Sequence, residues 1–175
     1  MALYYIRHGL TSWNIEKRIQ GHSDIELCED GIKQAYEAKQ LMKDVKIDKI
    51  YCSPLTRVKQ TCHIVNELWN APITYEERIK ERYFGDYEGK ILKPKVDMWN
   101  FEQPDVVPNG EDLRDFFDRV QSFLKEIDEE IKTKNVLIVA HGGVSLPCVE
   151  YYEGLDRSSN IRSKMILNGV VKKFK

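Results

Sequence analysis

The sequence predicts an α/β fold, a three-layer α/β/α sandwich with a mainly parallel central sheet. Two observations lead to this prediction. Short apolar segments of strand character alternate along the 175 residues with longer segments of helical periodicity. One apolar segment, 136–140, is an unbroken run, as expected of a strand that is covered on both faces. Alternating strands and helices imply right-handed crossovers, which place helices on both faces of a parallel sheet.

Five short segments have the composition of strands. The last of them follows the turn-like pair Asn168-Gly169. In chain order the predicted strands are 3–6, 50–52, the weaker candidate 73–75, 136–140, and a final strand that contains Val170 and Val171.

Three segments have the three- and four-residue apolar spacing of amphipathic helices. The spacing is moderate over 30–44, and a second helix follows Pro54, a residue that suits the first turn of a helix. The clearest pattern covers 111–132. We interpret its stripe as core, and the stripe consists of Leu113, Phe116, Phe117, Val120, Phe123, Leu124, Ile127 and Ile131.

The composition is that of a globular protein, and we expect a single domain over residues 1–175. The 27 basic and 28 acidic residues give a net charge of -1, which offers no reason to expect nucleic acid or a membrane as a partner. The apolar start stops at Arg7, too early for a secretory signal, and no run approaches the ~20 apolar residues of a membrane span. We therefore expect a cytoplasmic protein.

The four cysteines are scattered and include no CxxC pair, which favours free thiols over a disulfide framework or a zinc site. No histidine pair has the spacing of metal ligands on a helix. We therefore expect no metal.

Two of the predicted strands are each followed by a histidine and a glycine. His8-Gly9 comes after the first strand, and His141-Gly142 comes after the fourth. The carboxyl ends of parallel strands meet at one edge of the sheet, where such folds bind their ligands. Either histidine alone fits a structural role, but the two together predict a shared site.

Arginines accompany these histidines. Arg7 precedes His8, and Arg57 comes shortly after the end of the second strand, where a single arginine would ordinarily be a solvated surface residue. The planar guanidinium group matches the oxygens of a phosphate in a bidentate way. Two arginines and two imidazoles therefore predict a pocket for an anion.

These segments resemble the histidine phosphatase superfamily, which includes the cofactor-dependent phosphoglycerate mutases. The order and spacing of four blocks agree with that family from Leu3 to about Gly169, and the resemblance implies a phosphoglycerate mutase-like fold. The blocks are Arg7-His8-Gly9 with Thr11, Trp13 and Asn14, continued by Gln20-Gly21-His22-Ser23-Asp24; Ser53-Pro54-Leu55-Thr56-Arg57 with Gln60-Thr61; Glu81-Arg82-Tyr83-Phe84-Gly85 with Glu88-Gly89; and His141-Gly142.

The resemblance implies a role for each matching residue. His8 is expected to attack phosphorus and become phosphohistidine, and Glu81 to protonate the leaving group and then activate water. By composition alone Glu81 would be a surface residue in a charged run. The residues expected to bind the phosphoryl group or the substrate are Arg7, Asn14, Gln20, Gly21, Arg57, His141 and Gly142, and no cofactor is implied.

One feature selects the branch of the family, and two others favour a small phosphatase over a mutase. The acid phosphatase and phytase branch typically has an aspartate where this chain has Gly142, so the chain looks like the branch of mutases and small phosphatases. The mutases are generally longer and carry adjacent arginines between the acid and the last helix. Here that segment, 90–109, is short and has no Arg-Arg pair.

We therefore expect a phosphomonoesterase that acts on a small phosphorylated metabolite. A 2,3-bisphosphoglycerate-dependent phosphoglycerate mutase is the alternative, and a non-catalytic phosphate-binding module ranks last. A homodimer is left open.

Segment 90–109 is expected to set the substrate. Its three lysines, Lys90, Lys93 and Lys95, suit an acidic substrate. Trp99 and Phe101 either line a pocket for the leaving group or pack the loop against the body of the protein. Of the two remaining histidines, His22 either borders the substrate or faces solvent, and His63 is expected on the surface.

Overall fold

The five predicted strands form one sheet in the computed structural model, which describes residues 1–91 and 96–175. The strands are β1 (Leu3–Arg7), β2 (Lys49–Cys52), β3 (Ile73–Tyr75), β4 (Val136–Ala140) and β5 (Val171–Lys173), and their order in the sheet is β3-β2-β4-β1-β5. The pairs β3-β2, β2-β4 and β4-β1 are parallel, whereas β5 runs antiparallel to β1. The prediction of a mainly parallel sheet is confirmed.

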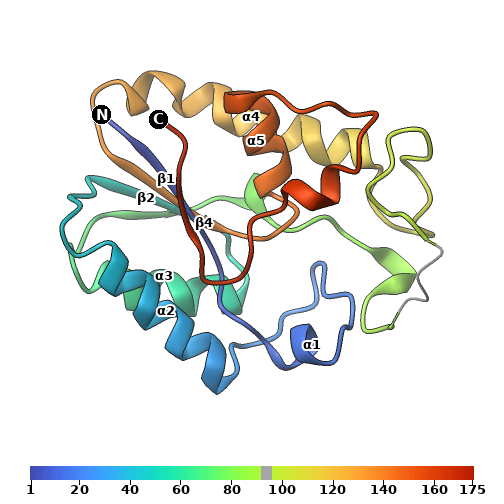
Figure 1. Ribbon diagram of the computed structural model, residues 1–175, viewed down its shortest axis with the longest axis horizontal. Coiled ribbons are helices and arrows are strands. Elements are labelled where there is room, and N and C mark those ends of the chain that lie inside the picture. The colour runs from blue at the N-terminus through green and yellow to red at the C-terminus, as the bar shows by residue number, and fades with distance from the viewer. Residues whose placement is uncertain (92–95) are drawn as a thin grey trace.

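Helices cover both faces of this sheet, which makes the three predicted layers (Figure 1). Helices α2 (Glu29–Leu41) and α3 (Thr56–Asn66) lie on one face, and α4 (Leu113–Ile131) and α5 (Ser145–Glu153) lie on the other. The pleat of the strands divides the core accordingly. Leu137 and Val139 belong to the apolar cluster on the α2 and α3 side, whereas Val136 and Ile138 belong to the cluster on the α4 and α5 side.

The three predicted helices exist with slightly different ends. The first ends at Leu41 rather than at 44, and the helix after Pro54 ends at Asn66. The third begins at Leu113, and all eight residues of its stripe are buried, which confirms that the stripe is core.

Several short elements lie outside the predicted set. They are α1 (Ser12–Ile15), α5, and the 3₁₀ helices η1 (Glu77–Ile79), η2 (Gly85–Tyr87) and η3 (Ile161–Lys164). Helix α5 escapes a search for amphipathic spacing because its first five residues are all buried and it contains Pro147. A single-turn helix such as α1 is too short for the spacing to develop.

The structure also bears on two predictions that were made from composition. All four cysteines are unpaired, as predicted, and three of them are buried: Cys52, Cys62 and Cys148. Across residues 1–91 and 96–175, the helices are too short or too polar to cross a bilayer.

Candidate active site

The carboxyl ends of three neighbouring strands bring His8, Ser53 and His141 together. The backbone N–H of His8 donates to the carbonyl of Ala140 at 3.0 Å, and that of Ser53 donates to the carbonyl of Val139 at 3.1 Å. These bonds continue the register of the sheet by one residue beyond each strand. The rings of His8 and His141 consequently lie 5.3 Å apart, centroid to centroid. The two histidines therefore lie together at the edge of the sheet where the carboxyl ends of the parallel strands meet.

His8 is held as a neutral imidazole with one free nitrogen. Its side chain is buried, with 3% of its surface exposed, and Nδ1 lies 2.7 Å from the carbonyl oxygen of Gly9. A carbonyl oxygen can only accept, so Nδ1 carries the proton and Nε2 keeps its lone pair. Burial, together with the charges of Arg57 and Arg7, holds the pKa of His8 well below its usual range. Nε2 is therefore available as a nucleophile.

His141 is fixed by Ser53, a residue to which the sequence motif assigned no separate role. Nε2 of His141 lies 2.8 Å from the hydroxyl oxygen of Ser53, and the hydroxyl of Tyr5 donates to the carbonyl of His141 at 2.5 Å. Burial is also the main cause that lowers the pKa of His141 well below its usual range. Its Nδ1 is buried and has no partner within the described part of the chain. An atom left in this way is suited to a ligand.

Two guanidinium groups, of the buried Arg57 and the half-buried Arg7, are anchored by carbonyl oxygens. Arg57 donates to the carbonyls of Gly21 and Ser23, both at 2.8 Å, and Arg7 donates to the carbonyl of Ile166 at 2.8 Å. Nε of each arginine is buried without a partner within residues 1–91 and 96–175. Arg57 is fully buried, so its interpretation as an isolated surface residue is wrong, and burial lowers its pKa to about 10. A carbonyl holds the group without neutralising its charge, which favours an anionic ligand.

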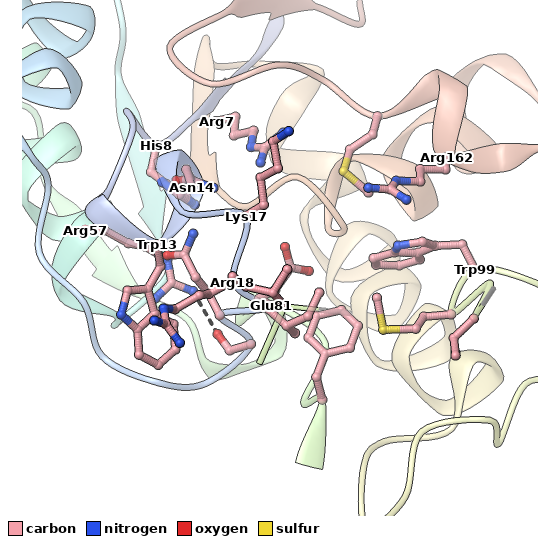
Figure 2. A pocket seen from close by; sticks show the side chains of 18 residues that line it. Arg7, His8, Trp13, Asn14, Lys17, Arg18, Arg57, Glu81, Trp99 and Arg162 are labelled. Carbon is pink, nitrogen blue, oxygen red and sulfur yellow. Dashed lines mark hydrogen bonds between the residues drawn. The ribbon is translucent and has the colours of Figure 1, made fainter. Parts of the chain in front are cut away.

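Asn14 is oriented by the helix cap in which it takes part. Its Oδ1 accepts from the backbone N–H of Thr11 at 3.0 Å, while Thr11 Oγ1 accepts from the backbone N–H of Asn14 at 3.2 Å. This reciprocal pair is a capping box. Because the oxygen of the amide is occupied, its nitrogen is the atom left for the cavity, where Asn14 lies beside Arg57 and His8 (Figure 2).

The loop that carries Gln20 and Gly21 is shaped by Glu88. The Glu88 carboxylate accepts from the backbone N–H groups of His22 and Ser23, each at 2.8 Å. Gly21 has φ +53, and a Cβ there would lie 2.0 Å from Oε1 of Glu88, so only glycine fits. Oε1 of Gln20 is buried and has no partner in the described residues. Gln20 and Gly21, which the resemblance assigns to substrate binding, both line the cavity.

Glu81 reaches the same cavity from the segment between η1 and η2. Its Oε2 accepts from the backbone N–H of Gly143 at 2.9 Å, and its Oε1 accepts from that of Arg82 at 3.0 Å. The interpretation of Glu81 as an ordinary surface residue is therefore wrong, because its carboxylate lies in the cavity wall beside the turn that follows β4. Gly142, in that turn, lies where a Cβ would be 2.7 Å from Cζ of Arg7, so it gives Arg7 its space.

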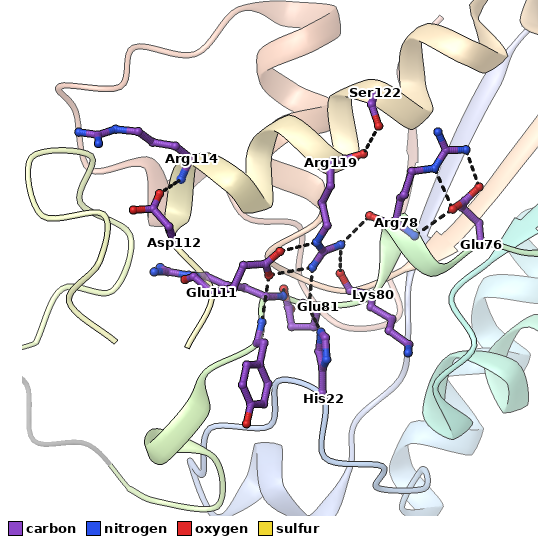
Figure 3. A network of polar contacts seen from close by, with 12 residues as sticks. His22, Glu76, Arg78, Lys80, Glu81, Glu111, Asp112, Arg114, Arg119 and Ser122 are labelled. Atoms are coloured by element: carbon purple, nitrogen blue, oxygen red, sulfur yellow. Dashed lines mark hydrogen bonds and ion pairs between the residues drawn. The ribbon is translucent and has the colours of Figure 1, made fainter. Parts of the chain in front are cut away.

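The backbone of Glu81 is held by Arg119, a residue of α4 (Figure 3). Arg119 donates to the carbonyl of Glu81 at 2.9 Å, and also to the carbonyls of Arg78 and Lys80. Glu111 pairs with Arg119 at 2.5 Å. His22 Nε2 lies 2.8 Å from the same Glu81 carbonyl. Sequence periodicity could not assign Arg119 this role, because its three acceptors are backbone oxygens of another segment.

The site residues surround a cavity of about 500 Å³. Of the two aromatic residues expected to line it or to pack a loop, Trp99 lines it, whereas Phe101 packs on Phe117 with ring centroids 4.9 Å apart. The lining residues are Arg7, His8, Trp13, Asn14, Lys17, Arg18, Ile19, Gln20, Gly21, Arg57, Glu81, Phe84, Ile91, Val96, Met98, Trp99, Arg162 and Met165.

The remaining residues singled out in the sequence lie elsewhere. Lys90 is exposed and is absent from the lining, while Lys93 and Lys95 fall outside the described residues. His22 is half-buried, supports the Glu81 carbonyl and does not line the cavity, whereas His63 is exposed as predicted. Within residues 1–91 and 96–175, no three His, Cys, Asp or Glu side chains are grouped as a metal site would require.

Known proteins are similar to this chain in sequence and in fold. The family model described as histidine phosphatase superfamily (branch 1) matches residues 3–174. The chain is 39% identical to the uncharacterized phosphatase PhoE of Bacillus subtilis, over 81% of this chain and 72% of that protein. It is 32% identical to the probable phosphoglycerate mutase GpmB of Salmonella choleraesuis, over 85% of this chain and 73% of that protein.

A solved structure is similar over almost the whole chain. The alpha-ribazole phosphatase of Shigella flexneri superimposes with a TM-score of 0.84 at 28% sequence identity, and the match covers 99% of this chain and 89% of that one. The fold described above is therefore that of a known phosphatase structure.

Proposed function

This chain belongs to branch 1 of the histidine phosphatase superfamily, and we propose that it is a metal-independent phosphomonoesterase that hydrolyses a small phosphorylated metabolite. One observation carries the proposal. The free Nε2 of a neutral, buried His8 shares a cavity with two guanidinium groups that are anchored by carbonyls rather than by carboxylates. A nucleophile beside uncompensated positive charge suits attack on a phosphate dianion.

In the first step, the lone pair of His8 Nε2 attacks phosphorus as the bond from phosphorus to the ester oxygen breaks. Arg7 and Arg57 offset the charge on the other phosphoryl oxygens, and His141 and the amide nitrogen of Asn14 add neutral hydrogen-bond donors. Glu81, in its protonated form, transfers its proton to the departing alkoxide oxygen. The products of this step are the free alcohol, phosphohistidine and the Glu81 carboxylate.

In the second step, the Glu81 carboxylate takes a proton from a water molecule whose oxygen attacks phosphorus. The bond between phosphorus and Nε2 breaks, and its electron pair returns to the imidazole. Inorganic phosphate leaves, and Glu81 holds the proton for the next cycle. One carboxylate thus serves as acid and then as base, because the water attacks phosphorus from the side on which the alcohol has left.

The names of two relatives support hydrolysis, since PhoE and the structure from Shigella flexneri are both called phosphatases. The test is phosphate release from p-nitrophenyl phosphate in EDTA. We expect turnover by the native protein, none by His8→Ala, and native turnover by the control His63→Ala, which removes an exposed histidine. Activity that survives in His8→Ala would refute His8 as the nucleophile, and activity that EDTA abolishes would refute metal independence.

A phosphoglycerate mutase is the second candidate, because the chain is also similar to a protein named for that activity. A mutase must return the phosphoryl group to an alcohol before water reaches it. We expect 2,3-bisphosphoglycerate to leave the rate of interconversion of the two monophosphoglycerates unchanged. Interconversion that depends on this compound and exceeds phosphate release would favour the mutase.

A further inference from the structure

The cavity wall holds more positive charge than one phosphoryl group requires. A phosphate monoester carries at most two negative charges, which the guanidinium groups of Arg7 and Arg57 already match. The chain as a whole has a net charge of -1, so the excess is local. The charged residues of the lining are the cations Arg7, Lys17, Arg18, Arg57 and Arg162 and the carboxylate Glu81.

Two of these cations are unengaged. Arg18 is paired with Glu16 at 2.5 Å and donates to the carbonyl of Gly89 at 2.8 Å. In contrast, the side chains of Lys17 and Arg162 make no ion pair or hydrogen bond with any residue of 1–91 or 96–175. Residues 92–95 include no acid. Lys17 and Arg162 are therefore the cations available to a part of the ligand other than the phosphoryl group.

Lys17 lies in a left-handed turn at the end of α1, where a lysine is uncommon. Lys17 has φ +58, and the backbone N–H of Arg18 donates to the carbonyl of Trp13 at 2.9 Å. This is the left-handed residue that ends a helix, a position that glycine and asparagine favour and where another residue costs about 1 kcal/mol. The chain thus places a lysine in an unfavourable conformation at the wall of the cavity.

Both cations lie where the alcohol part of the substrate would be. Lys17 and Arg162 line the same cavity as Glu81, which is the proposed proton donor to the leaving oxygen (Figure 2). Lys17 comes from the turn after α1, and Arg162 comes from η3. The same cavity wall also has apolar side chains, among them Trp99 and Met165. The leaving-group part of the cavity therefore combines apolar surface with two free positive charges.

We propose that Lys17 and Arg162 bind a second anionic group of the substrate. The preferred substrates are then phosphomonoesters whose alcohol part carries a carboxylate or a second phosphate. The inference rests on the proposed function for the location of the leaving group. It does not depend on Lys90, Lys93 and Lys95, the lysines of segment 90–109 that the sequence alone suggested for an acidic substrate. Lys17 and Arg162 act on binding and selectivity, and they take no part in the transfer of the proton or the phosphoryl group.

The test compares two ligands of equal shape that cannot be hydrolysed. 3-Carboxybenzylphosphonate and 3-carbamoylbenzylphosphonate differ by one charge, and their Kd values are measured by calorimetry. The variants are Lys17→Asn, which suits the left-handed backbone, and Arg162→Gln. The control is Lys125→Gln, an exposed lysine of α4 outside the cavity. A third ligand, 1,3-phenylene-bis(methylphosphonate), distinguishes a second phosphate from a carboxylate.

We expect the native protein and the control to bind the carboxylate at least tenfold more tightly than the amide, a ratio typical of one charge-assisted hydrogen bond. Each variant should lose about threefold or more of this preference, and the double variant should lose all of it. The amide should bind all proteins within about threefold. A tighter bisphosphonate would identify phosphate as the second group.

Two outcomes would overturn the inference: no preference for either anionic ligand in the native protein, or a preference that survives in the double variant. Binding of phosphonates needs no turnover, so this result is independent of the hydrolysis assay. Charge preference without His8-dependent hydrolysis would overturn the proposed function alone. Hydrolysis without charge preference would overturn only the inference.

Discussion

The carboxylate of Glu81 and the backbone N–H of Gly143 are joined by a hydrogen bond of 2.9 Å, although 62 positions separate the two residues in the chain. The other carboxylate oxygen accepts from the N–H of Arg82. Both oxygens are thereby oriented, and one of them is tied to the turn that also carries His141. The proposed acid is therefore positioned by the same turn that carries His141, which reduces the reorganisation needed before reaction.

Glu81→Gln should separate the two proposed steps. The amide oxygen can still accept from Gly143, but the side chain no longer transfers protons. For alkyl phosphates, whose leaving group needs a proton, we expect kcat to fall about 10³-fold. For p-nitrophenyl phosphate, whose leaving group departs unprotonated, stopped-flow absorbance should show a burst of p-nitrophenolate followed by slow turnover, because attack by water has become limiting. Equal, small losses for both substrates would contradict the role of Glu81.

Gly143→Ala should disturb the same carboxylate by steric contact. A Cβ at this position would lie 2.1 Å from Oε1 of Glu81 and 2.4 Å from Cη2 of Trp99. We expect kcat to fall about tenfold to a hundredfold, since displacement of a catalytic group by about 1 Å has effects of this size. Gly154→Ala is the control. An added Cβ there would have no atom within 4 Å, but the φ of +80 strains the backbone of an alanine. This control should lower the melting temperature and leave kcat unchanged.

Arg119→Lys should weaken the support of the Glu81 backbone. Lysine keeps the charge near Glu111 but cannot donate to three carbonyls in the geometry of a guanidinium fork. We expect kcat to fall about tenfold with KM within twofold, and the pH profile of kcat to shift because the environment of the acid changes. Arg114→Lys on the same helix is the matched control. If the decrease in kcat of Arg119→Lys is fully explained by an equal decrease in the fraction of folded protein, the role of Arg119 is structural only.

The depressed pKa values of His8 and His141 predict the pH dependence of stability. In the unfolded chain these histidines bind protons as pH falls through ~6.5, while in the folded protein they stay neutral to a much lower pH. The unfolded state therefore binds more protons, and the free energy of unfolding decreases as pH falls below ~6.5. Each group contributes at most about 1.4 kcal/mol per pH unit. Urea unfolding between pH 7.5 and 5.5 should show a shallower decrease for His8→Gln, and an unchanged slope would contradict the depressed pKa of His8.

The arrangement of His8 and His141 was predictable because both residues directly follow parallel strands of one sheet. Two apolar runs followed by histidines, in a chain of alternating strands and helices, must end at one edge of a parallel sheet. The apolar runs also located the strands to within one or two residues. Arg57 was predicted in an anion pocket because it follows a strand end near the two histidines. The identity of Glu81 as a cavity residue came from the family resemblance, since its local composition indicates a solvated position.

Other contacts of the site could not be predicted, because they join segments that the sequence does not relate. Arg119 acts through backbone carbonyls, which have no signature in a sequence. Arg162 and Lys17 reach the cavity from a 3₁₀ helix and a tight turn, two elements without periodicity. Ser53 was part of a recognised block, and its position directly after a strand end would have been a usable signal for its contact with His141.

The place of β1 within the sheet determines which parts of the site open first. β1, which ends at Arg7, is hydrogen-bonded on both sides, to β4 and to β5. Segments paired on both edges and buried in the core exchange their amide hydrogens only in the rarest openings of a protein, whereas irregular segments fluctuate at much lower cost. The anion-binding end of the site is attached to the first kind of segment. The proton donor and the leaving-group wall are attached to irregular segments. Local opening of these segments can therefore admit and release an alcohol while the binding site for the phosphoryl group stays formed.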